Sequence, residues 1–166
     1  MIKATKTENV HSAKARLTNL SVSTKHSIEI SKYLRYKKVS AAKVFLENVV
    51  LLKSAVPFKT HNMDMGHKRG IGPGRYPTKA AKEFLTLLKS VESNAQDKGL
   101  NTDNLKISKL IANKASIPMT GGRHRQATKR THLEVEVIEG KEKKKSVKPA
   151  KKKAESKSEV PKVEKK

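Results

Sequence analysis

The sequence contains no cysteine and no tryptophan, and it has few acidic residues. The absence of cysteine excludes disulfides, thiolate nucleophiles and thiolate metal ligands, which fits a reducing compartment and predicts a cytoplasmic protein. No apolar run is long enough to span a bilayer, and Met1–Lys6 lacks the apolar core of a secretory signal. We therefore expect no membrane partner.

What the sequence does have is positive charge. Its 38 Lys and Arg outnumber 15 Asp and Glu, which gives a net charge of +23 at pH 7. A hydrophobic content of 35% in 166 residues suffices for one modest domain with extensions. A protein this basic repels itself unless a counter-charge is present, and nucleic acid is the natural counter-charge.

The composition changes near Gly140. Residues 141–166 hold 12 Lys and four Glu and almost nothing that can be buried, so we predict a disordered Lys-rich tail. Lys151–Lys153 leave three interpretations open: nuclear import, loose RNA contact, or a solvated tail with no single partner. Residues 1–140 keep +15 of the net charge and are predicted to form a single domain.

Residues 105–138 predict a β-hairpin. Apolar side chains alternate with polar ones in both limbs, Leu105 and Ile107 in the first and Leu133, Val135 and Val137 in the second. Each limb therefore has one face that can be buried. Farther out the alternation is lost, and Lys106 to Arg130 contain seven Lys or Arg and no acid. An isolated two-stranded ribbon is marginal in water, so we expect a polyanion to hold this part. The alternative is a mobile basic loop.

The register of this hairpin follows from the side-chain pattern. Pairing Ile107 with Val135 places Lys106 opposite Glu136, in agreement with cross-strand pairing preferences. This register centres a three-residue loop on Gly121, where glycine can take the left-handed conformation. A two-residue turn would be off by one residue, so we predict the three-residue loop or a compensating bulge near the tip.

The remaining pattern predicts an α+β fold, with three helices packed on a small antiparallel sheet and the long hairpin as an extension. The elements expected are a strand at 12–17 with a basic outer face and helices at 24–36, from 40 to 53 or 54, and 78–98. Ser23 and Ser40 are the expected N-caps, and Gly99 the expected stop of the third helix. A helix-turn-helix interpretation of the first two helices is disfavoured because Ala41, Ala42, Val44 and Phe45 begin the second helix, where DNA reading needs long polar side chains.

Residues 55–77 are rich in glycine and proline, so regular structure is not expected there. Glycines let backbone N–H groups approach phosphates, and the interleaved cations can reach neighbouring ones, so the segment suits an RNA surface. A nucleotide-binding loop is disfavoured because the Gly-x-x-x-x-Gly-Lys-[Ser/Thr] order is absent. His61, Asp64 and His67 could be drawn as a metal triad, but no regular element is expected to fix them.

Several motifs resemble universal large-subunit ribosomal protein family twenty-two, in its archaeal and eukaryotic branch. The matching segments are Val56–Phe58, Gly66–Lys68, Gly74–Ala81, Leu87–Ala95 and Lys98–Leu100, and the likeness extends over about residues 8–138. The resemblance implies a compact α/β body on the outside of the large subunit. It also implies a long hairpin that threads through ribosomal RNA to the wall of the nascent-chain exit tunnel.

In that family the hairpin tip helps to form a tunnel constriction with a loop of the family-four protein. By position, Gly122-Arg123 matches the family's tip and His132–Glu134 its returning strand. Where the family usually has several arginines before the tip, this chain has residues 115–119, Ala-Ser-Ile-Pro-Met. The resemblance thus implies a tunnel tip at Met119, Thr120, Gly121, Gly122 and Arg123.

The composition, the motifs and the resemblance together predict a non-enzymatic protein without cofactor or metal, which binds large-subunit ribosomal RNA, neighbouring ribosomal proteins and the nascent peptide. The expected RNA-binding residues are Lys14, Arg16, His67, Lys68, Arg69, Arg75, Tyr76, Lys79, Lys109, Lys114, Arg123, His124, Arg125, Lys129 and Arg130. The main alternative is a basic DNA-binding or chromatin protein. An enzyme is a weaker alternative, because no paired carboxylates, cysteine or phosphate loop can be assembled.

Overall fold

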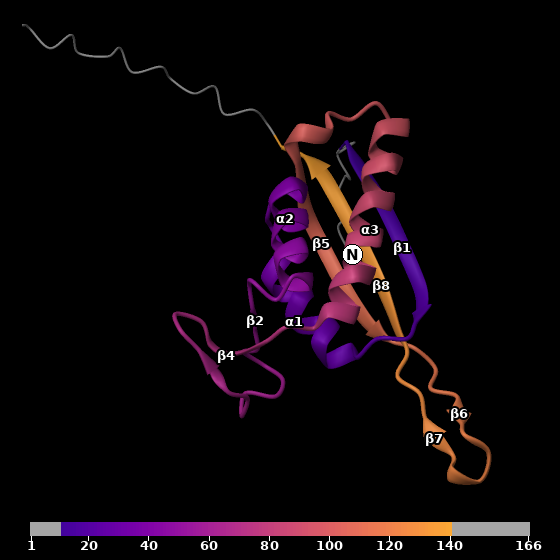
Figure 1. Ribbon diagram of the computed structural model, residues 1–166. Coiled ribbons are helices and arrows are strands. Elements are labelled where there is room, and N and C mark those ends of the chain that lie inside the picture. Colours follow the sequence, from indigo (N-terminus) through magenta and orange to yellow (C-terminus); the bar gives the residue numbers. More distant parts are fainter. Residues whose placement is uncertain (1–10, 141–166) are drawn as a thin grey trace, which may run out of the picture.

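The computed structural model describes residues 11–140, and the tail predicted at 141–166 lies outside the described residues. One antiparallel sheet has the order β1 (Ser12–Leu20), β8 (Thr131–Glu139) and β5 (Leu105–Lys114). The helices α1 (Thr24–Leu34), α2 (Val39–Val50) and α3 (Thr78–Asp97) lie over one face of it (Figure 1). The predicted α+β class is confirmed, and so is the first strand as a member of this sheet. Within residues 11–140 no helix is both long and apolar enough to cross a bilayer.

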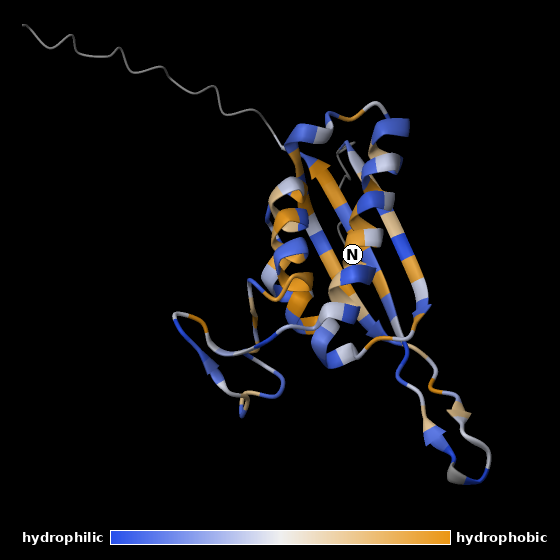
Figure 2. Ribbon diagram, viewed as in Figure 1, coloured by the Kyte–Doolittle hydropathy of each residue, from blue (hydrophilic) through white to orange (hydrophobic). Residues whose placement is uncertain are grey.

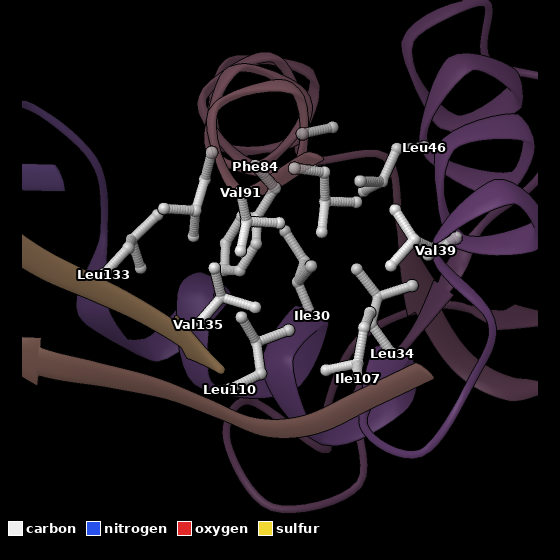
Figure 3. Packing of buried hydrophobic residues seen from close by; sticks show 14 of the residues in the cluster. Ile30, Leu34, Val39, Leu46, Phe84, Val91, Ile107, Leu110, Leu133 and Val135 are labelled. Atoms are coloured by element: carbon white, nitrogen blue, oxygen red, sulfur yellow. The ribbon is translucent and has the colours of Figure 1, made fainter. Parts of the chain in front are cut away.

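The core lies between the sheet and the helices. Figure 3 shows Phe84 and Val91 of α3 meeting strand residues such as Val135 and Leu110, and all four side chains are buried. Hydrophobic burial of this kind contributes about 25 cal/mol per Å² of apolar surface. The third helix ends as predicted, because Gly99 has φ +70° and the Leu100 N–H donates to the Ala95 carbonyl over 3.0 Å.

The first two helices differ in detail from the prediction. Ser23 is the N-cap of α1, but its side chain makes no capping hydrogen bond. The N-cap of α2 is Lys38 rather than the predicted Ser40, because the fully buried Val39 already belongs to the helix. This helix ends at Val50, earlier than predicted, where the chain turns through Leu52 at φ +60°.

Neighbouring segments make hydrogen bonds to both edges of the sheet. On the β5 edge, the segment between α1 and α2 exchanges backbone hydrogen bonds with Ile107, from the Tyr36 N–H and to the Lys37 carbonyl, both at 3.0 Å. On the β1 edge, the Asn94 side chain donates to the Lys14 carbonyl over 2.8 Å. These hydrogen bonds satisfy part of the backbone hydrogen-bonding capacity of each edge.

The register of the long hairpin differs from the prediction. Ile107 pairs with Val137, not Val135, and a bulge before Lys109 then brings Lys109 opposite Glu136. The bulge thus lies at the base and not near the tip, and it is what keeps both limbs' apolar faces inward. The loop is also longer than predicted, because Thr120 pairs with Gln126 and leaves residues 121–125 to turn.

The segment 55–77 contains a small sheet where no regular structure was expected. Its strands β2 (Val56–Pro57), β4 (Gly72–Arg75) and β3 (His67–Lys68) pair antiparallel in that order. The prolines are tolerated because the strands are very short, and the Pro73 carbonyl still accepts the Phe58 N–H over 2.9 Å. Phe58 is fully buried, which fastens this sheet to the body.

Candidate nucleic-acid interface

Two protrusions leave the same end of the body (Figure 1). We call residues 115–130 the distal hairpin and residues 59–76 the glycine-rich arm. Figure 2 shows that both are mostly hydrophilic or neutral in hydropathy, in contrast to the orange core side of the helices and strands. Neither protrusion contributes more than an occasional side chain to the core, Met65 in the arm and Ala115 in the hairpin being the buried apolar ones. Their shape must therefore be supported by something other than the protein's own core.

The distal hairpin has very little internal pairing. Its ladder consists of β6 (Met119–Thr120) and β7 (Gln126–Ala127), with Thr128 donating to the Pro118 carbonyl below it. Gly121, at φ +92°, takes the left-handed conformation predicted for it and begins a turn of 3-10 helix at Gly122–His124. Arg123 and Arg125 are exposed at the tip, whereas the His124 side chain lies outside the described residues. The tip thus presents two guanidinium groups on a turn.

The glycine-rich arm displays most of the cations predicted for it. His67, Lys68, Arg69 and Arg75 are exposed, and Tyr76 is half-buried. The Lys68 ammonium lies 5.7 Å from the centre of the Tyr76 ring, so these two residues are brought together across the arm. The described residues contain no group of three or more His, Cys, Asp or Glu arranged to hold a metal ion, and His61, Asp64 and His67 form none.

The outer face of the main sheet is less free to bind phosphate than the sequence suggested. Lys14 and Lys109 flank Glu136, at 3.4 and 3.1 Å, and Arg16 lies 3.0 Å from Glu134. The hydrogen bond from Lys109 is the largest cause that lowers the pKa of Glu136, which therefore stays ionised. The three cations are more than half exposed, but each already has a carboxylate neighbour.

The cations at the root of the hairpin differ in exposure. Lys114 and Lys129 are exposed, and Lys79 is exposed nearby at the start of α3. Arg130, by contrast, is half-buried and donates from Nη1 to the Asn19 carbonyl over 3.2 Å, so it fastens the end of β1 to the hairpin. Arg130 therefore has a structural contact within the chain.

The prediction from sequence missed two residues at this root, Lys25 and His26, in the first turn of α1. They line a hollow together with Lys114 and Lys129. Burial, followed by the charges of Lys129 and Arg75, lowers the pKa of His26. The positive charge of the hollow comes from the lysines that line it. The only available signal was the basic Lys25-His26 pair directly after the predicted N-cap.

A small α+β body with basic extensions that lack a core of their own is typical of a ribosomal protein. The family described as ribosomal protein L22p/L17e matches residues 15–138, most of the chain. Relatives named large ribosomal subunit protein uL22 include that of Methanoregula boonei, 38% identical over 81% of this chain and 93% of the relative. That of Methanoculleus marisnigri is 42% identical over 80% and 91%, and that of Thermoplasma acidophilum 46% identical over 61% and 68%. The chain belongs to the ribosomal protein L22p/L17e family, which confirms the family predicted from its motifs.

Proposed function

We propose that this chain binds large-subunit ribosomal RNA through its two protrusions and that its hairpin tip lines the nascent-chain exit tunnel. As a member of its family the protein is a structural constituent of the large ribosomal subunit and not an enzyme, and it is cytoplasmic as part of the ribosome. It associates there with ribosomal RNA and other ribosomal proteins. Beyond this, we propose which residues contact the RNA and that the hairpin tip lies at the tunnel wall.

The distal hairpin is the feature that most favours RNA binding. It combines Arg123, Arg125 and Lys129 with no acidic residue, and its internal contacts are the short ladder of β6 and β7 and a few hydrogen bonds below it. Repulsion between its cations opposes a compact free structure, whereas phosphates on both sides would stabilise one. Each phosphate that the protein neutralises steepens the fall of log affinity with log salt by roughly 0.7 to 0.9.

The tip supports a second contact of different chemistry. Met119 is 69% exposed and Ile117 is 38% exposed, so an apolar surface lies just before Gly121 and Arg123. Apolar side chains on an otherwise basic hairpin gain nothing from phosphate, but they suit a passing polypeptide. We assign Met119–Arg123 to the tunnel wall, facing the nascent peptide and the family-four ribosomal protein.

The experiment is a sucrose gradient of cell extract with the tagged chain. The full chain is expected in the large-subunit fractions after a high-salt wash, and a variant with residues 116–128 replaced by a short Asn-Gly turn is expected to be depleted from them. Lys82→Gln with Lys89→Gln, two exposed lysines of α3, is the matched control and should remain. A basic DNA-binding protein would instead bind duplex DNA with comparable affinity and would not enter these fractions.

A further inference from the structure

A groove lies where the hairpin leaves the body, between the beginnings of α1 and α3. It consists of two adjoining hollows of about 520 and 310 Å³. Both hollows are lined by Ser23, His26 and Lys129, so they form one continuous depression. We call it the root groove.

The root groove is lined by cations and hydroxyl groups. Lys25 and Lys114 border the larger hollow, Lys79 the smaller one, and Lys129 both. None of the described residues that line either hollow is Asp or Glu. The outer sheet face differs in this respect, because its lysines and arginine are matched by Glu134 and Glu136. The positive charge of the root groove is thus not neutralised by its own walls.

One feature of the walls adds to this positive potential, and another fixes the position of a wall residue. Neither α1 nor α3 has an acidic residue in its first turn or a side-chain capping hydrogen bond, so the partial positive charge of each helix start remains. The His26 ring also packs edge-on against the buried Phe58, with 5.3 Å between ring centres. This contact fixes the imidazole in the groove wall.

The position of the root groove favours RNA as its partner. Lys129 lies in both the root groove and the distal hairpin, and Lys114 lies in the groove directly before the hairpin begins, so a polyanion along the hairpin would run directly into the groove. We propose that the root groove binds backbone phosphates of the large-subunit RNA, with Lys25, Lys79 and Lys129 as the neutralising side chains. This inference rests on the proposed function in taking RNA as the partner, and it adds a docking site on the helical body.

The test compares two charge-matched double variants of the full chain in binding to large-subunit ribosomal RNA. Lys25→Gln with Lys129→Gln removes two cations of the root groove, and Lys82→Gln with Lys89→Gln removes two exposed cations of α3 elsewhere. We expect the groove variant to bind about tenfold more weakly and with a salt dependence shallower by roughly 1.4 to 1.8, since two phosphate contacts are lost. The control should stay within about twofold of the wild type.

Equal affinities of the groove variant and the control would overturn the root groove as an RNA site. All four substituted lysines are exposed, and equal melting temperatures of the two variants verify that folding is unchanged. A third variant, Arg123→Gln with Arg125→Gln, separates this inference from the proposed function. If that variant weakens binding while the groove variant matches the control, only the root groove is refuted. Failure of the wild type to bind the RNA would refute both.

Discussion

The carboxylate of Glu29 in α1 accepts the backbone N–H of His61 over 2.8 Å. The same carboxylate accepts the N–H groups of Lys59 and Thr60, at 3.1 and 3.0 Å, and Glu29 is only 2% exposed. Hydrogen bonds from several N–H groups stabilise the charge of a buried carboxylate. Glu29 therefore holds the start of the glycine-rich arm against the body.

Replacing Glu29 with alanine should loosen the start of the arm. We expect the free energy of unfolding to fall by about 2 kcal/mol, because three N–H groups lose a charged acceptor and water only partly replaces it. Glu29→Gln keeps one acceptor oxygen and should cost less. Chemical denaturation measures both values. Glu47→Ala, at an exposed position of α2, is the control and should change stability by less than about 0.5 kcal/mol.

Shortening the hairpin should separate folding from binding. Replacing residues 116–128 with an Asn-Gly turn removes the weakly paired part and leaves the pair of Lys114 with Thr131 intact. The free energy of unfolding should stay within about 1 kcal/mol of the wild type, since a shorter loop costs slightly less closure entropy. A large loss in a denaturation experiment would mean that the distal hairpin is part of the folding unit.

Removing the acids of the outer sheet face should increase RNA affinity. Glu134→Gln with Glu136→Gln frees Lys14, Arg16 and Lys109 from their carboxylate neighbours. Exposed ion pairs contribute at most about 1 kcal/mol each, so the fold should survive. If this face touches RNA, the salt dependence of binding should become steeper by roughly 0.7 to 0.9 for each new phosphate contact. An unchanged salt dependence would assign the face to solvent or to a protein neighbour.

The folded chain should lose stability in mildly acidic solution through His26. Burial, and then the charges of Lys129 and Arg75, lower its pKa below the ordinary value of 6.5, and Lys25, Lys79, Lys114 and His61 also border the site. As the pH falls from 6.5 through the lowered pKa, the unfolded chain takes up the proton first, so the free energy of unfolding decreases. Above this window the His26 contribution is constant.

Chemical denaturation at stepped pH values measures this effect. His26→Gln should flatten the pH dependence below 6.5, because the imidazole whose pKa is lowered by burial is then gone. His67→Gln, at an exposed position of β3, is the matched control and should keep the slope of the wild type. An identical slope in both variants would contradict the assignment to His26.

Much of the body was predictable because its signals are local. The stripe of α3, with Ala81, Phe84, Leu88 and Val91 at helical spacing, is found buried as expected. Gly99 also stops that helix as expected, since a left-handed residue is needed there. The hairpin register was wrong because a bulge by definition breaks the alternation from which a register is counted, and Ser108 carries no side-chain signal for it.

The candidate site was less predictable, because charge alone does not say what a cation faces. Lys14 and Lys109 lie far apart in sequence, and only the sheet order shows that both flank Glu136. The root groove was missed for the same reason, since it assembles Lys25, Lys79 and Lys129 from three separate elements. The anchoring of the arm by Glu29 was equally invisible, as a lone acid in a helix predicts no partner.

Hydrogen exchange of the distal hairpin, in the free chain and in purified large subunits, shows whether RNA holds this hairpin in shape. We expect amides of residues 115–130 to exchange fast in the free chain, while those of β5 and β8 are protected, and we expect the hairpin amides to become protected in the subunit. Protection of residues 115–130 in the free chain equal to that of the sheet would contradict the claim that RNA holds this hairpin in shape.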